Sequence, residues 1–198
     1  MLNLTEEEII IIKSFQTFCL VVGFFFNSWS VVIVFRFKIF QSKFTKYLMR
    51  NQFLFDSIIC GYAPLIIWIF KIEYDANSRL DAFICYFWTS QGTFWMSCCL
   101  ANQNLVWITI DRFLLVVYPI FYKTHLKMLI FIYFSFLSFV SVFFGILISF
   151  TVDIRNASCI IIIQPERSIF LVSAAGYSVL NYFIPMFVFI FCFFKIIS

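Results

Sequence analysis

One acidic and one basic residue, Asp111 and Arg112, stand side by side in the otherwise apolar segment NLVWITIDRFLLVVYPIFY. Charged side chains are costly in hydrocarbon, but a pair at a helix end costs less because long basic side chains can reach headgroups and water. Two interpretations are open. The pair is either an interfacial ion pair beside a basic loop, or a switch that is closed in a helix bundle and released by a cytoplasmic partner.

Three further polar residues, Asn27, Asn51 and Asp56, also interrupt apolar stretches. We expect these side chains to face the interior of a helix bundle, bonded to each other or to water, because exposure to lipid would be costly. A switching role and a purely structural role, in which the polar contacts only join the helices, are both open.

The composition indicates what kind of fold positions these residues. The sequence is 63% hydrophobic and 12% charged. Soluble domains are nearer ~45–50% apolar and ~25% charged, so a chain of this size is expected to lie in lipid. The sequence has no glycine-rich phosphate loop, no zinc-ligand spacing and no nucleophile–base set. We therefore expect no enzyme activity, no cofactor, no metal site and no nucleic-acid partner.

Long charge-free runs predict helices that cross the membrane, because about 20 apolar residues span a bilayer. Four runs reach that length, and the run Ser57–Phe70 does so when it is extended back through Asp56. The runs lack the alternation of barrel strands, which leaves helices. The prediction is an all-α, polytopic transmembrane bundle, one domain over residues 1–198, with five spans: Ile9–Phe37, Tyr47–Phe70, Ala82–Val117, Leu126–Phe150 and Ser173–Ile197.

The distribution of charge predicts the orientation of the bundle. Five basic residues and no acid lie in the stretch 36–50, between the first two spans, while the start MLNLTEEE is acidic. By the positive-inside rule the amino terminus lies outside, and the first span is a retained signal anchor. The sequons at Asn3 and Asn156 also fall outside, where they predict glycosylation.

The segment IDRFLLVVYPIFY resembles the third-helix signature of rhodopsin-like (class A) G protein-coupled receptors, which reads Asp-Arg-Tyr, then aliphatic residues, Pro-Leu and a further Tyr. Asp111, Arg112, Phe113, Pro119 and Tyr122 stand in that register. The resemblance implies that Asp111, Arg112 and Phe113 form the switch that couples a receptor to a heterotrimeric G protein.

Other positions extend the resemblance along residues 23–195. Asn27 matches the buried asparagine of the first helix, Asn51 and Asp56 match the ends of the second-helix motif, and Pro185 matches the fifth-helix proline. The resemblance also implies a disulfide between Cys85, at the outer end of the third helix, and Cys159, in the second outer loop. The other five cysteines lie within spans and are expected to be apolar fillers.

By the same register, Phe94, Trp95 and Cys98 face the outer half of the bundle and form the expected ligand pocket. Receptors for amines resemble one another in carrying an aspartate where Phe94 stands, so an amine ligand is disfavoured. Ala101 replaces a serine that helps to bind sodium in the family, which argues against a sodium site at Asp56. The resemblance leaves the extracellular ligand unnamed.

The given sequence ends at Ser198, after the fifth span, whereas the family has two further helices. The expectation is a receptor fragment, at the plasma membrane when full length, that does not signal alone. Its unpacked side exposes Asn102, Asn104 and Asn181 to lipid if these side chains face that way. The alternative is a truncated, non-signalling protein that associates with full-length receptors, as in a receptor oligomer, or retains them. A transporter fragment is disfavoured because paired buried charges and broken helices are lacking.

Overall fold

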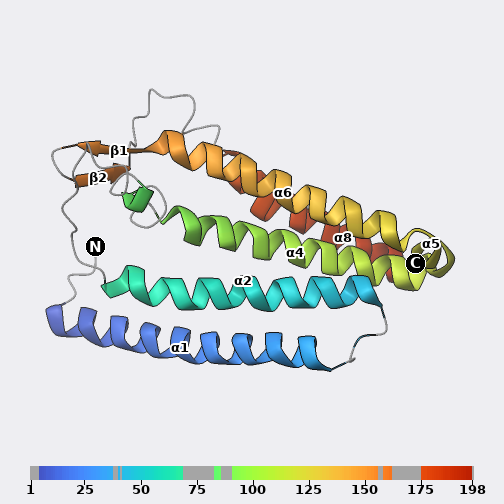
Figure 1. The fold of residues 1–198 in the computed structure, drawn as a ribbon, viewed down its shortest axis with the longest axis horizontal. Coiled ribbons are helices and arrows are strands. Elements are labelled where there is room, and N and C mark those ends of the chain that lie inside the picture. The colour runs from blue at the N-terminus through green and yellow to red at the C-terminus, as the bar shows by residue number, and fades with distance from the viewer. Residues whose placement is uncertain are drawn as a thin grey trace.

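The computed structural model describes the backbone of residues 5–37, 40, 42–68, 83–85, 91–155, 158–161 and 175–197. Its long helices lie side by side in one bundle (Figure 1). The all-α class is confirmed for this part of the chain, apart from one short hairpin. The helices are α1 (Glu6–Arg36), α2 (Lys43–Trp68), α4 (Gly92–Val117), α5 (Pro119–Thr124), α6 (Leu126–Thr151) and α8 (Ile184–Ile197), with a π-helix η2 (Val179–Phe183) directly before α8.

Local sequence explains where two of the helices begin. Thr5 caps α1 in a capping box: its hydroxyl accepts from the backbone N–H of Glu8 at 3.3 Å, and the Glu8 carboxylate accepts from the backbone N–H of Thr5 at 2.8 Å. Pro119 occupies the first position of α5, where a missing backbone N–H costs no helical hydrogen bond. The acidic residues Glu6–Glu8 thus form the first turn of α1.

The membrane-crossing potential of the helices is unequal. Three of the described helical segments are long and apolar enough to cross a membrane, namely Glu6–Arg36, Leu126–Ile146 and Ala175–Ile196. The protein is therefore a candidate multi-pass membrane protein. The helices α2 and α4 are each 26 residues long but carry more polar side chains, which turn toward one another inside the bundle.

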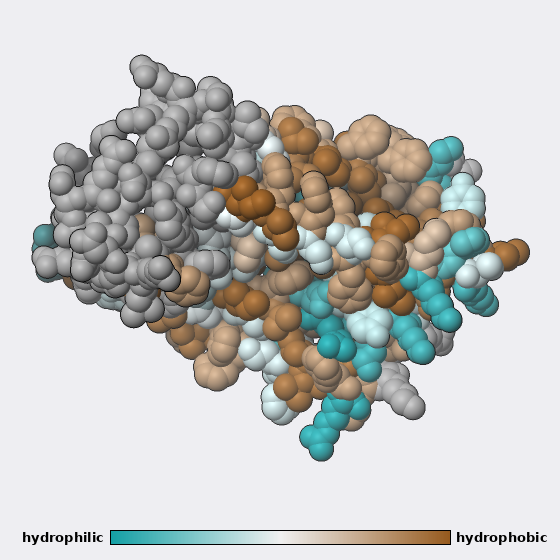
Figure 2. Space-filling model, turned by 45° about the horizontal axis from the view of Figure 1, so that its top comes forward, coloured by the Kyte–Doolittle hydropathy of each residue, from teal (hydrophilic) through white to brown (hydrophobic). Residues whose placement is uncertain are grey.

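The buried core lies between α2, α4, α5 and α6. Half of its residues come from α6, while α1 contributes Val34 as its one buried residue. Large aromatic side chains on the outer face of α1, such as Phe15 and Phe26, are about two-thirds exposed in the isolated protein. In Figure 2 hydrophobic side chains cover the middle of the bundle, and hydrophilic ones gather toward the end where α5 lies. This distribution suits a bundle whose sides face lipid.

The helices α1 and α2 approach closely at two glycines. A methyl group at Gly23 would lie 3.1 Å from the Cys60 sulfur, and one at Gly61 would lie 3.1 Å from the Phe24 ring. Both distances are tighter than most side-chain contacts, so a methyl group at either glycine would require the neighbouring side chain to shift by a few tenths of an ångström. Small residues at helix contacts are typical of membrane bundles.

Three features differ from the sequence-based prediction. The helix α4 begins at Gly92 rather than near Ala82, because Gln91 directly before it has a left-handed backbone with φ of 59°. The π-helix η2 was not predicted, although Pro185 follows it and such prolines disturb the hydrogen bonds of the preceding turn.

The third difference is an antiparallel hairpin in a segment that was predicted as a loop. Strand β1 (Val152–Arg155) pairs with β2 (Ser158–Ile161), with Val152 opposite Ile161 and Arg155 opposite Ser158. Both strands carry β-branched residues, which favour extended backbone, and only residues 156–157 separate them. Two short β-branched runs separated by two residues are visible in the sequence and favour such a hairpin.

Candidate functional site

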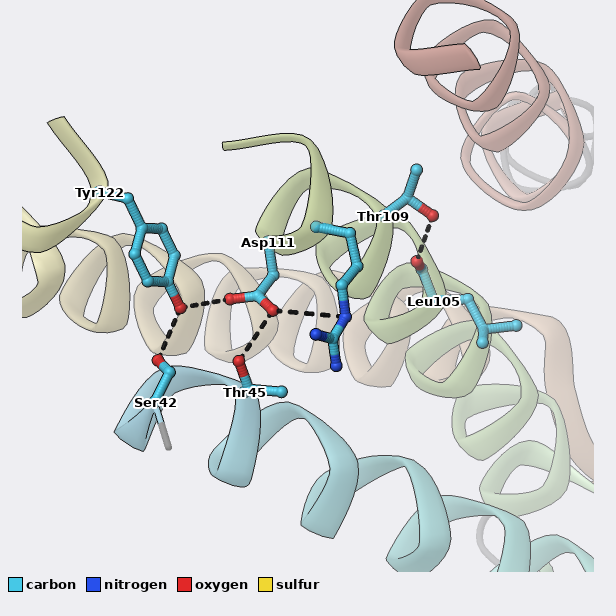
Figure 3. Close-up of polar contacts among 7 residues, drawn as sticks. Ser42, Thr45, Leu105, Thr109, Asp111 and Tyr122 are labelled. Atoms are coloured by element: carbon cyan, nitrogen blue, oxygen red, sulfur yellow. Dashed lines mark hydrogen bonds and ion pairs between the residues drawn. The ribbon is translucent and has the colours of Figure 1, made fainter. Parts of the chain in front are cut away.

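Asp111 is completely buried near the end of α4. Its carboxylate accepts a hydrogen bond of 2.9 Å from the Thr45 hydroxyl of α2 and one of 2.6 Å from the Tyr122 hydroxyl of α5 (Figure 3). The Tyr122 oxygen also lies 2.6 Å from the Ser42 hydroxyl, just before α2. Because the tyrosine proton is given to Asp111, Ser42 is the donor in that second bond. One carboxylate thus joins the ends of α2, α4 and α5.

Arg112 makes a looser contact with the same carboxylate. Its Nε lies 4.0 Å from Oδ2 of Asp111, and half of the Arg112 side-chain surface is exposed. Charge-assisted hydrogen bonds between nitrogen and carboxylate are normally about 2.7–2.9 Å long. The negative charge of Asp111 is therefore met chiefly by two hydroxyl groups, and the Arg112 guanidinium is accessible at the surface.

The short helix α5 positions the tyrosine of this cluster. Tyr122 bonds through its backbone N–H to the carbonyl of Tyr118 at 3.0 Å, and its side chain is only 3% exposed within the core. Burial and the hydrogen bond to Asp111 raise the pKa of Tyr122 above its usual range. A tyrosine is protonated at neutral pH in any case, and the raised pKa lets Tyr122 keep the proton that it donates to the carboxylate to a higher pH than usual.

Phe113 packs beside this cluster rather than inside it. Its ring centroid lies 5.9 Å from that of Tyr118 and 6.1 Å from that of Phe191 on α8. Phe113 therefore connects the corner between α4 and α5 to the last helix. Thr109, also drawn in Figure 3, bonds back to the Leu105 carbonyl of its own helix at 3.0 Å and takes no part in the cluster.

A second polar cluster lies further along the bundle, around Asn104. The completely buried Asn104 amide donates to the Leu48 carbonyl and to the Gln52 side-chain oxygen, each at 2.9 Å, and accepts from the Tyr133 hydroxyl at 2.7 Å. Asn51 donates to the same Tyr133 oxygen at 2.7 Å. Every hydrogen-bonding group of the Asn104 amide is thus paired, and α2, α4 and α6 are tied together.

The three residues predicted as one buried polar network, Asn27, Asn51 and Asp56, are not all linked to one another. The Gln52 amide donates to both carboxylate oxygens of Asp56, at 3.1 and 3.2 Å, so a chain of hydrogen bonds leads from Asn51 to Asp56 through the Asn104 cluster. Asn27 is half-buried and contacts the Cys60 thiol instead. The structure therefore links Asn51 with Asp56, while Asn27 stands apart in the hydrogen bonds described.

The condition under which lipid would reach Asn102, Asn104 and Asn181, that they face outward, is not met. Asn104 and Asn181 are buried, and Asn102 is half-buried and donates to the Asn181 side chain at 3.2 Å. Gln103, also buried, donates to the Leu180 carbonyl in the π-helix η2. Hydrogen bonds between α4 and η2 thus pair the amides of Asn102, Gln103 and Asn181, which removes the cost of exposing them to hydrocarbon.

The three predicted ligand-pocket residues have different surroundings in the described part of the structure. Phe94 lines an open groove of about 540 Å³ between α1 and α2, together with Gln16, Cys19 and Gln91 among others. Trp95 instead turns to Tyr177, with the ring centroids 5.8 Å apart, and is nearly half exposed. Cys98 is half-buried and does not line that groove.

The cysteines agree in part with the expected disulfide. Cys85 is disulfide-bonded and buried, whereas the five cysteines of the predicted spans are free thiols. Cys159 lies in β2, but its side chain, like the sequon residues Asn3 and Asn156, lies outside the described part of the structure. The pairing of Cys85 with Cys159 stays a prediction, which peptide mapping without reduction would test.

Several residues of the two clusters were not foreseen, above all Tyr133 and Gln52. Neither has a sequence signal beyond being polar in an apolar run. Tyr133 lies 82 positions from its partner Asn51, and Gln52 lies 52 positions from its partner Asn104. Within the residues described, no group of three or more His, Cys, Asp or Glu side chains is placed to hold a metal ion.

Comparison with known proteins gives no further assignment: no protein-family model and no curated protein sequence matches the chain.

Proposed function

We propose that the protein is a rhodopsin-like G protein-coupled receptor that senses an extracellular ligand and couples to a heterotrimeric G protein. One observation carries the proposal. Asp111 is buried and held by hydroxyl groups from two other elements, while the adjacent Arg112 is half exposed at the same end of α4. The motif resemblance supports the same assignment of these two residues.

The arrangement can act as a restraint with two states. In the state described, the carboxylate of Asp111 joins the ends of α2, α4 and α5 and lies 4.0 Å from Arg112. A partner that accepts hydrogen bonds from the Arg112 guanidinium competes with this weak ion pair rather than with the hydroxyl bonds. A switch of this kind changes state when the competing contacts become stronger than the restraint.

The proposal places this cluster on the cytoplasmic side. In this topology all five long helical segments cross the bilayer, and α2 and α4 do so with their polar side chains turned inward. The bases Arg36, Lys43 and Lys123 lie at the same end as Arg112, whereas Glu6–Glu8 begin α1 at the other end. An epitope added after Met1 should be stained on intact cells. Staining only after permeabilisation, with surface expression shown independently, would contradict this topology.

Signalling should need more than the five long helical segments. They correspond to the first five of the family's seven helices, and the family's sixth helix moves outward to admit the G protein. We therefore expect coupling only when two further helices are present, on the same or on a second polypeptide. The restraint at Asp111 would then control access to Arg112.

The test is G protein dissociation, measured by energy transfer between labelled subunits in cells that express the chain with a second fragment supplying helices six and seven. Coupling above that of the second fragment alone supports the proposal, provided that Arg112→Ala abolishes it. Thr109→Ala serves as a control, because that hydroxyl bonds only within its own helix. Coupling by the 198-residue chain alone, or coupling that survives Arg112→Ala, would contradict the mechanism.

A second candidate is a non-signalling protein that associates with intact receptors and retains them. The open groove lined by Gln16, Gln91 and Phe94 favours it, because another transmembrane helix could cover this partly polar surface between α1 and α2. If the chain never couples but lowers the surface level of a co-expressed intact receptor, this second function replaces the first.

A further inference from the structure

Arg50, on α2, carries a positive charge for which the described part of the protein supplies no acid. Its guanidinium carbon lies 3.6 Å from the centroid of the Phe35 ring on α1 and 5.9 Å from that of Tyr47. Arg112 has Asp111 beside it, whereas Arg50 Nε is buried without a hydrogen-bond acceptor in the described part of the protein. Phe35 holds the guanidinium by its ring face, a contact that leaves the positive charge unneutralised.

The contact with Phe35 shows how far along the bundle the Arg50 charge lies. Phe35 is next to Arg36, the last residue of α1, although the Arg50 backbone lies two turns inside α2. The contacts Thr17–Trp68, Phe24–Gly61 and Ser28–Ser57 set an antiparallel register in which Phe35 lies opposite Arg50, so the guanidinium lies where α1 ends. The bases Arg36, Lys43 and Lys46 lie between this level and the end of the bundle, and the next acid along α2 is Asp56.

An apolar groove leads directly to this guanidinium. It has a volume of about 340 Å³ and opens between α1 and α2, lined by Phe24, Ser28, Val31, Leu54, Ser57, Ile58 and Gly61. Val31 and Phe35 lie one turn apart on the same face of α1, as do Leu54 and Arg50 on α2. The groove and the charge are therefore consecutive parts of one surface that faces the surrounding lipid.

We propose that this surface binds a phospholipid with an anionic headgroup. The headgroup phosphate accepts hydrogen bonds from the Arg50 guanidinium, and an acyl chain lies in the groove below it. A soluble phosphate would neutralise Arg50 but leave the groove uncovered, whereas a phospholipid fits both parts. The bound lipid would pack against both α1 and α2 near the end of α1. This inference does not depend on the receptor function.

The experiment is native mass spectrometry of the purified full chain in detergent with equal amounts of phosphatidylglycerol and phosphatidylcholine that carry the same acyl chains. The chain should retain phosphatidylglycerol in preference. Arg50→Gln should lower the ratio of anionic to neutral lipid retained by about fivefold. Lys123→Gln is the matched control, because it removes one exposed charge on α5, away from the groove, and should leave the ratio unchanged.

Two further variants separate charge from shape and guard against misfolding. Arg50→Lys keeps a positive charge and should keep most of the preference, which would show that the effect of Arg50→Gln is not a folding defect. Leu54→Trp fills the groove at a position that is 46% exposed and should reduce the retention of both lipids. Circular dichroism of each variant confirms its helical fold before the comparison.

Three results would overturn the proposal. An unchanged lipid ratio in Arg50→Gln would remove the role of the guanidinium. Unchanged retention in Leu54→Trp would remove the role of the groove. Displacement of phosphatidylglycerol by an excess of its soluble headgroup, glycerophosphoglycerol, would show that the site binds a free phosphate group instead of a membrane lipid.

Discussion

The two polar clusters of the bundle differ in how completely their members are paired. Around Asn104 every group is neutral, and the amide uses both of its N–H donors and its oxygen at distances of 2.7–2.9 Å. Around Asp111 the central group is a carboxylate, its firm partners are hydroxyl groups, and its charged neighbour Arg112 lies 4.0 Å away and half exposed. In the first cluster the central amide has a partner for every hydrogen-bonding group, whereas in the second the carboxylate and the guanidinium are not closely paired.

This difference separates a structural role from a switching role. A saturated network of neutral groups in a low-dielectric interior gains nothing by rearranging, so it fixes the register of α2, α4 and α6. A buried carboxylate beside a half-exposed guanidinium can exchange partners when a better acceptor for the guanidinium arrives. We therefore assign stability chiefly to Asn104 and its partners, and the proposed coupling chiefly to Asp111 and Arg112.

The largest expected effect on stability comes from Asn104→Ala. The change removes the acceptor of the Tyr133 hydroxyl and the amide donor to the Leu48 carbonyl and the Gln52 side-chain oxygen, at a cost of about 3 kcal/mol in the free energy of unfolding. Thermal unfolding in detergent would measure it, with Thr109→Ala as the control that stays near the unchanged protein. A loss no greater than that of the control would contradict the structural role.

A smaller loss is expected from Tyr122→Phe, which keeps the ring but removes the hydroxyl that donates to Asp111. Since the carboxylate retains Thr45 and Ser42 loses one acceptor, the cost should be about 1–2 kcal/mol. The same unfolding assay applies. A double-mutant cycle with Asp111→Asn should show that the two effects are not additive. Additive effects would mean that the two side chains act independently.

The smallest effect concerns alkaline pH. Because folding raises the pKa of Tyr122 above its ordinary value of 10, the folded state holds that proton more tightly than the unfolded state. Its contribution to stability is therefore complete below pH 10 and is lost as the pH rises from there through the raised pKa. Unfolding measured from neutral to strongly alkaline pH should show a shallower decline in Tyr122→Phe. An identical decline in both proteins would rule out this contribution.

The sequence was sufficient to predict the helical class and several helix positions, because long apolar runs leave few alternatives to helices. The four residues Thr5–Glu8 also contain the whole signal for the start of α1, since a capping box is local. The hairpin at 152–161 differs from the predicted loop, because the position between two apolar spans indicates a loop whereas the β-branched runs within it favour strands.

The candidate site could be predicted only in part. Asp111 and Arg112 stood out because charge is rare in an apolar run, so their chemistry is visible without any structure. Their partners were not visible, since Thr45 lies 66 positions before Asp111 and looks like any polar residue near a helix start. The sequence also left open which way Asn181 faces; the structure shows it buried and bonded to Asn102 of α4.

The central claim is that the Asp111 carboxylate restrains Arg112 through their ion pair, whereas the Asn104 cluster only stabilises. The most direct test is basal G protein dissociation at equal surface expression, in cells that supply helices six and seven as a second fragment. Asp111→Asn should raise basal coupling because it removes the charge that pairs with Arg112. Tyr122→Phe, which keeps the carboxylate, and Asn104→Ala, although it is the less stable protein, should not raise it. Equal increases in all three variants, or no increase in Asp111→Asn, would contradict the account.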